Sequence, residues 1–173
     1  MKNPTKAQKV LLWTLFALYI LLMIWIILLK RHFSFAGLVQ ERAINLVPFY
    51  YNDAGIVYGI QITELLANVA VFFPYGVYLA TLKGKLKWGY VPAIIVGTSF
   101  LFECLQWAFS IGVPDITDLI TNTVGGLLGM AVWGLLYALC RNKEKRDWLI
   151  AALASAGTLA LLGYLLLMHR IHR

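Results

Sequence analysis

The sequence predicts an all-α fold, a polytopic membrane helical bundle that forms one domain over residues 1–173. Of these 173 residues, 61% are hydrophobic and 13% charged, and the mean hydropathy is +0.75. A soluble domain is about half apolar and a quarter charged. A helix needs about 20 apolar residues to cross a hydrocarbon core of about 30 Å. Five stretches qualify, which predicts about five transmembrane helices: Val10–Leu29, Glu64–Leu82, Tyr90–Ile111, Asp118–Cys140 and Trp148–Met168.

The first stretch resembles a secretory signal because lysines precede it, but it is longer than the usual apolar region of such a signal. Val10–Leu29 runs for 20 residues without a charge, and no A-x-A cleavage site follows. We therefore expect an uncleaved first span.

The connection between the first two spans, Lys30–Thr63, is 34 residues long and rich in aromatic residues. Aromatic side chains favour the headgroup level of a membrane. We expect this connection to be external, and either to lie along the membrane surface or to re-enter the membrane. The sequence leaves open whether it contains a re-entrant helix.

The second span carries polar residues at its first end. Glu64 and Asn68 are four residues apart and so share one helix face. Pro74 removes one backbone hydrogen bond, so we expect a bend in mid-membrane, which Gly76 makes easier.

The third span carries one polar stripe, because Ser99, Glu103, Gln106 and Ser110 are separated by four, three and four residues. Glu103 is expected roughly 12 Å below the end of the span. A carboxylate inside a membrane costs about 2.5–3.5 kcal/mol on insertion scales, and its default interpretation is a functional one.

The fourth span begins with a similar stripe, formed by Asp115, Asp118, Asn122, Gly125 and Gly129. Asp115 is expected to cap the helix, and Asp118 to lie in its first turn, where the helix dipole favours negative charge. Asn122 lies one turn deeper, and the two glycines allow another helix to approach closely.

Each stripe also has a structural interpretation. The acids can cap helices at the interface, the glycines can serve packing, and interhelical amide hydrogen bonds are worth roughly 0.6 kcal/mol each. Because three spans direct polar stripes toward the same half of the membrane, we favour a shared polar cavity there.

Orientation follows from the positive charges, which concentrate on the cytoplasmic side of membrane proteins. With the N-terminus inside, ten Lys and Arg residues are internal and five external. This predicts a cytoplasmic N-terminus, an external C-terminus and an external polar cavity. The net charge of +7 is distributed in short clusters between apolar runs, so we expect no nucleic-acid partner.

Four short motifs resemble those of the VanZ-like family, in order and spacing, over a core of about residues 45–129. They are NLVPF at Asn45–Phe49, N-x3-F-x-P-x-G at Asn68–Gly76, E-x2-Q at Glu103 and Gln106, and D-x2-D-x3-N-x2-G at Asp115–Gly125. The resemblance implies a multi-pass protein of the bacterial cytoplasmic membrane that is associated with reduced susceptibility to teicoplanin and related lipoglycopeptides.

One hypothesis is a non-enzymatic protein that binds a membrane lipid, a lipid-linked envelope precursor or the acyl tail of a lipoglycopeptide in the outer leaflet. The expected ligand-binding residues are Asn45, Glu64, Asn68, Glu103, Gln106, Asp115, Asp118 and Asn122. The expected structural residues are Pro48, Pro74, Gly76, Gly125 and Gly129.

The alternative is an intramembrane enzyme that modifies a lipid-linked envelope substrate. Glu103 and Asp118 are its catalytic candidates, as general acid and base. Oxygen ligands from these residues and Asn122 would suit Mg²⁺, Mn²⁺ or Ca²⁺, although the sequence does not require a cofactor. An ion or proton path is less favoured, because the inner halves of the spans offer no continuing ionisable chain.

Overall fold

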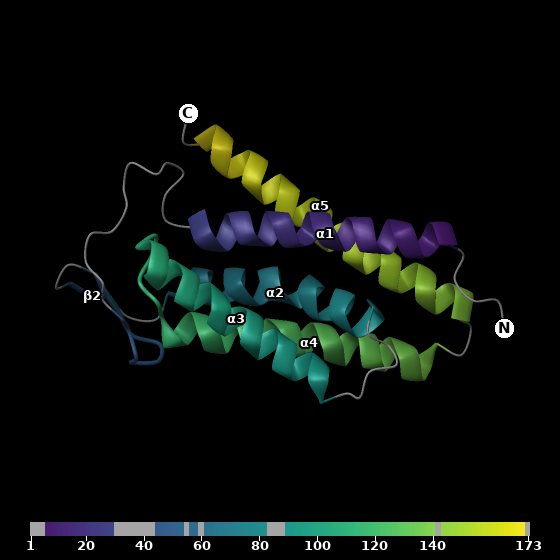
Figure 1. Ribbon diagram of the computed structural model, residues 1–173, viewed down its shortest axis with the longest axis horizontal. Helices are drawn as coiled ribbons and strands as arrows, with labels where there is room; N and C mark the ends of the chain where they lie inside the picture. Colours follow the sequence, from purple (N-terminus) through teal and green to yellow (C-terminus); the bar gives the residue numbers. More distant parts are fainter. Residues whose placement is uncertain are drawn as a thin grey trace.

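In a computed structural model, the described residues form five helices and one small β-hairpin (Figure 1). The structure describes residues 6–29, 44–53, 56–58, 61–82, 89–140 and 143–171, and side chains within 10–27, 44–50, 61–82, 89–140 and 149–163. The helices are α1 (Lys6–Leu29), α2 (Ile62–Leu82), α3 (Tyr90–Phe109), α4 (Ile116–Leu139) and α5 (Lys143–Ile171). The predicted all-α bundle is confirmed.

The first four helices are each long and apolar enough to cross a membrane, and they match the predicted spans closely. Within α5, the described apolar part is the shorter segment Leu149–Gly163. These bounds were predictable because the length of each apolar run sets the length of its helix.

The described part of the connection between α1 and α2 contains a hairpin. Strand β1 (Tyr51–Asp53) pairs antiparallel with β2 (Ile56–Tyr58), with Tyr51 opposite Tyr58. No helix occurs in residues 44–53 or 56–58. The rest of this predicted surface or re-entrant segment lies largely outside the described residues.

Helix α2 is the centre of the bundle and contacts each of the other four helices. Its most extensive contact is with α4. These two helices run in the same direction, because α3 returns the chain between them (Figure 1). The starts of α2 and α4 therefore lie at the same end of the bundle as the ends of α1 and α3. We call this end the polar end, for the residues described below.

Glycines allow the parallel helices α2 and α4 to touch through their backbones. A Cβ at Gly125 would overlap the carbonyl oxygen of Val69, and one at Gly129 would overlap that of Phe73. From the other side, a Cβ at Gly76 would overlap the carbonyl oxygen of Gly126. The close helix approach expected at Gly125 and Gly129 is therefore present.

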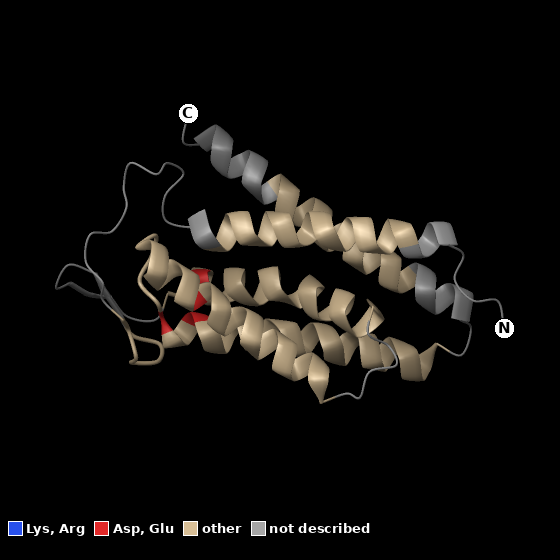
Figure 2. Cartoon of the chain, in the orientation of Figure 1, with Lys and Arg blue, Asp and Glu red and all other residues tan. Residues whose placement is uncertain are grey.

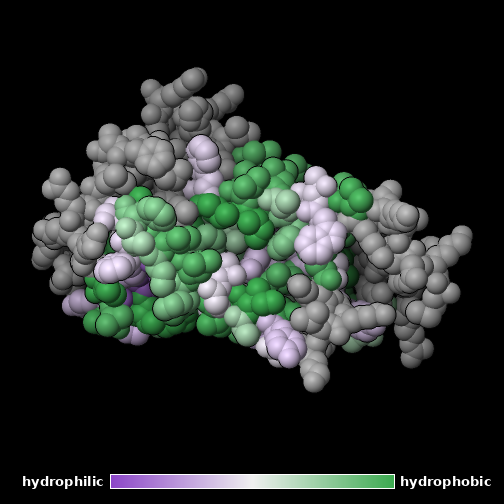
Figure 3. Space-filling model, in the orientation of Figure 1, coloured by the Kyte–Doolittle hydropathy of each residue, from purple (hydrophilic) through white to green (hydrophobic). Residues whose placement is uncertain are grey.

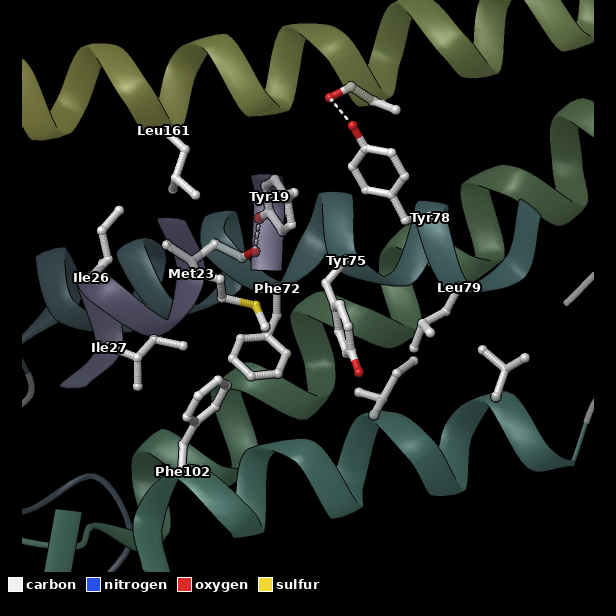
Figure 4. Packing of buried hydrophobic residues seen from close by; sticks show 14 residues of the cluster. Tyr19, Met23, Ile26, Ile27, Phe72, Tyr75, Tyr78, Leu79, Phe102 and Leu161 are labelled. Atoms are coloured by element: carbon white, nitrogen blue, oxygen red, sulfur yellow. Dashed lines mark hydrogen bonds between the residues drawn. The ribbon is translucent and has the colours of Figure 1, made fainter. Parts of the chain in front are cut away.

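The core lies between α1, α2, α3 and α5, and five of its 14 buried residues are aromatic (Figure 4). Helix α2 continues as one element through Pro74. The buried ring of Pro74 packs so closely on Gly157 of α5 that a Cβ at Gly157 would overlap it. The Tyr19 hydroxyl of α1 donates to the carbonyl of Val71. The neighbouring Ala70 carbonyl lacks its usual helical donor, because residue 74 is a proline and has no backbone N–H. Packing from two neighbouring helices thus supports the proline-containing turn.

Large hydrophobic side chains also cover the outside of the bundle, as the broad green areas in Figure 3 show. Leu11 and Leu21 of α1, Phe100 of α3, and Leu128 and Leu135 of α4 are all exposed. Apolar surface of this extent marks contact with a membrane or a partner. Together with the long apolar helices, it defines a multi-pass membrane protein.

Candidate functional site

The charged side chains that the structure describes are all acidic, and all lie at the polar end (Figure 2). Glu64 lies in the first turn of α2, Glu103 on α3, Asp115 at the N-cap of α4 and Asp118 in the first turn of α4. The three polar stripes predicted from the sequence therefore meet at one end of the bundle.

Asp115 is the best-connected of these residues, and its side chain is 7% exposed. One carboxylate oxygen accepts a hydrogen bond from the backbone N–H of Thr117 at 2.7 Å, which is the N-cap expected from the sequence. The other oxygen accepts from the Asn45 side-chain amide at 2.9 Å. Both oxygens are thus used to start α4 and to hold the preceding connection.

Asn45 attaches the connection between α1 and α2 to the start of α4. Its backbone N–H donates to the carbonyl of Pro114 at 2.8 Å, and its carbonyl accepts from the N–H of Ile116 at 3.0 Å, as an isolated parallel bridge. Its side chain also shapes the next turn, since its amide donates to the Tyr50 carbonyl at 2.6 Å and its oxygen accepts from the Val47 N–H at 3.1 Å.

The turn after Asn45 contains the exposed residue Pro48 and then Phe49, whose φ is 60°. A non-glycine residue rarely adopts this left-handed conformation. The Phe49 N–H donates to the Thr117 hydroxyl at 2.9 Å, and Thr117 is fully buried. The turn is therefore fastened to α4 at both of its ends.

A second group of hydrogen bonds joins α2 to α4. The buried Asn68 amide donates to a carboxylate oxygen of Asp118 at 2.7 Å and to the Thr121 hydroxyl at 3.2 Å. The Thr121 hydroxyl in turn donates to the carbonyl of Thr117 at 2.8 Å. Glu64 is partly exposed one turn before Asn68.

Glu103 is 7% exposed and accepts a hydrogen bond from the backbone N–H of Asp115 at 2.9 Å. Helix α3 ends at Phe109, two residues before the predicted end of the span at Ile111, so Glu103 lies six residues before the end of the helix. Ser110, with φ 52°, ends α3 in the left-handed conformation, while the N–H of Ile111 donates to the Gln106 carbonyl. The carboxylate thus faces the start of the next helix.

Gln106 reaches toward α1, with its side-chain amide donating to the Ile27 carbonyl at 3.0 Å. Its side-chain oxygen is buried and accepts no hydrogen bond. Asn122, 2% exposed, likewise has a buried side-chain oxygen without a donor. Buried polar atoms normally have partners, so both oxygens are open acceptors that water or a ligand would satisfy.

Sequence reasoning missed two hydroxyl residues of this network, Thr117 and Thr121. They lie four residues apart at the start of α4, beside the stripe that begins at Asp115. This spacing was visible in the sequence, but threonine is common in apolar helices. Only the contacts with Phe49 and Asn68 give these two residues a role.

The divalent-cation expectation gains no support from the geometry. Within the described ranges, no three His, Cys, Asp or Glu side chains are grouped so that they could hold a metal ion. The helix dipoles explain why acidic residues gather at this end. The parallel helices α2 and α4 bring two positive N-terminal dipole ends together. Acidic residues in their first turns offset that charge.

The fold and this network define a small multi-pass membrane protein with a buried acid-and-amide cluster at one end of its bundle. A family model described as VanZ/LLP1 matches residues 16–141. The chain is 35% identical over 168 residues to Protein VanZ of Enterococcus faecium, and the match covers 95% of both chains. The chain therefore belongs to the VanZ-like family. No solved structure matches it.

Proposed function

We propose that this protein lowers the susceptibility of a bacterium to teicoplanin and related lipoglycopeptides by binding an amphiphile at its polar end. The amphiphile would be a membrane lipid, a lipid-linked envelope precursor or the acyl tail of the antibiotic. Membership of the VanZ-like family supports the phenotype, and the location of the polar residues supports the mode of action.

The observation that carries the proposal is the concentration of buried polar side chains at one end of a bundle whose outer surface is apolar. Asn68, Glu103, Gln106 and Asn122 are buried there, and two of their oxygens are open acceptors. An amphiphile that lies along the bundle would bring its chain to the apolar surface and its headgroup to this end.

The geometry favours binding over the enzymatic alternative. Both carboxylate oxygens of Asp115, and one each of Asp118 and Glu103, accept hydrogen bonds from the protein itself. These bonds fix the positions of the carboxylate oxygens, which suits recognition of a headgroup. A general acid or base, in contrast, needs an oxygen that faces the substrate.

The test is teicoplanin susceptibility of cells that express the wild type or Glu103→Gln, with the amount of each protein in the membrane measured in parallel. Glutamine keeps an oxygen that can accept from the Asp115 N–H, so the variant removes the charge and spares the fold. Cys104→Ser is the matched control, because Cys104 is the next residue on α3 and is exposed.

We expect the wild type and Cys104→Ser to protect the cells, and Glu103→Gln to lose protection at equal abundance. If the wild type does not change susceptibility, the proposed function is wrong for this chain. If Glu103→Gln protects as well as the wild type, the Glu103 charge has only a structural role.

A further inference from the structure

We propose that the turn at residues 45–50 is an anchor at the membrane interface, which inserts its apolar side chains among the lipids at headgroup depth. The partner of this surface is the lipid of the leaflet itself. The anchor holds the polar end of the bundle beside the lipid headgroups. This inference goes beyond the proposed function, since it does not depend on a bound amphiphile.

The turn presents an apolar surface to the outside of the protein. Its exposed side chains include the large hydrophobic residues Leu46, Val47, Phe49 and Tyr50. Apart from the Tyr50 hydroxyl, its only polar side chain is that of Asn45, whose amide donates inward to Asp115 and to the Tyr50 carbonyl. The turn contains no charged residue. An exposed surface of this composition marks contact with a membrane or a partner.

The turn is also held firmly by the protein behind it. The N–H groups of Asn45, Val47 and Phe49 all donate hydrogen bonds, and Pro48 has no N–H. These internal bonds lower the cost of moving the backbone out of water. Phe49 keeps its left-handed conformation, which is strained for a bulky residue and persists only where the surrounding structure fixes it. The four apolar side chains are therefore presented in a fixed arrangement.

The exposed tryptophan and tyrosine side chains indicate where the membrane interface lies. Within the described ranges they form two groups, at the polar end (Trp25, Tyr50 and Trp107) and at the opposite end (Trp13, Tyr90 and Tyr137). Tryptophan and tyrosine rings favour the headgroup level at both faces of a membrane. The turn thus carries one of the three rings that mark the interface at the polar end.

The surface between these two groups has a different composition. Its exposed large side chains have no polar atom, as at Leu18, Phe100 and Leu128. The other tyrosines whose side chains are described are buried, and their hydroxyls bond within the bundle: Tyr19, Tyr75 and Tyr78. A tyrosine that faced lipid chains would leave its hydroxyl without a partner. The pattern therefore fits a bilayer that lies between the two groups of rings.

The spacing of the two groups also fits a bilayer. Along α3, Tyr90 and Trp107 are 17 residues apart, which corresponds to about 25 Å and is close to the hydrocarbon thickness of about 30 Å. Along α1, Trp13 and Trp25 are 12 residues apart, about 18 Å, and tryptophan side chains can reach the interface from inside the span. Glu103 lies four residues before Trp107, about 6 Å along the helix. The acid-and-amide cluster is thus close to headgroup depth, where water is still present.

The experiment measures the depth of the turn by fluorescence quenching. A fluorescent NBD label is attached to Val47→Cys in a Cys104→Ser, Cys140→Ser background. The full-length protein is placed in phosphatidylcholine nanodiscs with one copy in each disc, so that a second copy cannot cover the turn. The discs contain lipids with a nitroxide quencher either near the headgroup or near the chain end. Phe100→Cys, exposed in the middle of α3, is the deep reference, and Gly89→Cys, at the start of α3, is the interface reference.

We expect the label at Val47 to be quenched more strongly by the nitroxide near the headgroup, like the label at Gly89. The label at Phe100 should be quenched more strongly by the nitroxide near the chain end. Two results at Val47 would overturn the inference. Quenching by neither nitroxide would place the turn in water, and the profile of Phe100 would make the turn a deeper, re-entrant segment.

The anchoring role of the Tyr50 ring is tested with the same label at Val47. Tyr50→Ser should weaken the quenching, and Tyr50→Trp should preserve it, because tryptophan also favours the interface. Both variants keep the backbone carbonyl that accepts from Asn45, so the turn keeps its fold. Tyr137→Ser, which removes an exposed ring at the opposite end, is the matched control and should have no effect.

Equal quenching at Val47 with and without Tyr50→Ser would also overturn the anchor. All of these measurements are made without antibiotic. A turn that stays in water would therefore refute the anchor and leave the susceptibility test of the proposed function unaffected.

Discussion

Asp115 joins three parts of the chain, and its removal should cost more than an ordinary helix cap. Asp115→Ala loses the cap on Thr117, worth about 1 kcal/mol, and the hydrogen bond from Asn45, worth about 1 kcal/mol more. We expect a loss of about 2 kcal/mol in the free energy of unfolding, measured by titration with dodecyl sulfate in mixed micelles. Leu46→Ala, an exposed neighbour of Asn45, is the control and should have little effect.

The interaction free energy between Asn45 and Asp115 can be measured separately from the N-cap hydrogen bond to Thr117. Asp115→Asn keeps an oxygen for the Thr117 N–H but places its amide nitrogen, a second donor, against the Asn45 amide. In a double-mutant cycle with Asn45→Ala, the two changes should be coupled by about 0.5 kcal/mol or more, as residues in contact are. Additive effects would contradict the direct bond between these side chains.

For individual residues, contacts within one helix were predictable from the sequence, and contacts between distant segments were not. The cap at Asp115 and the stripe through Asp118 were predictable, because both depend on spacing within one helix. The partner of Asp115 was not, since Asn45 is 70 residues away. The contact between Glu103 and the Asp115 N–H was not predictable for a similar reason, because the sequence does not show how the loop after Ser110 folds.

Among the helices, the parallel pair α2 and α4 should be the most sensitive to added volume. Gly129→Ala would place a methyl group against the Phe73 carbonyl of the neighbouring backbone, which cannot rotate away as a side chain can. We expect a loss of about 1–3 kcal/mol in the free energy of unfolding, as for other overpacked sites.

Gly97→Ala on α3 is the matched control, because a Cβ there has open space around it. Its only expected effect is the better helix propensity of alanine, a gain of at most about 1 kcal/mol. The same dodecyl sulfate titration compares both variants. Equal effects of the two substitutions would show that the backbones of α2 and α4 are not in close contact.

The helices were also the part of the fold that the sequence predicted best. Apolar length located α1 to α4 within a few residues, and the glycine spacing indicated a close helix contact. The spacing could not identify α2 as the partner of α4, because that depends on how the helices are arranged in space. The hairpin at Tyr51–Tyr58 was missed because its strands have only three residues each.

Across the whole molecule, the directions of the helices and the distribution of positive charge together determine which side of the membrane the polar end faces. The five successive helices place the start of α1 and the end of α5 at opposite ends of the bundle (Figure 1). The polar end is the one opposite the start of α1. If the excess of positive charge keeps the N-terminus in the cytoplasm, the acid-and-amide cluster faces the outside of the cell.

This orientation can be tested with single cysteines in a Cys104→Ser, Cys140→Ser background. Leu46→Cys places an exposed thiol at the polar end, and Gly89→Cys places one at the start of α3, at the opposite end. In intact cells, a membrane-impermeant maleimide should label Leu46→Cys and should label Gly89→Cys only after the membrane is permeabilised. The reverse pattern would put the polar cluster in the cytoplasm. A headgroup in the outer leaflet could then not reach Glu103, so the proposed mode of binding would fail even if the bundle itself were correct.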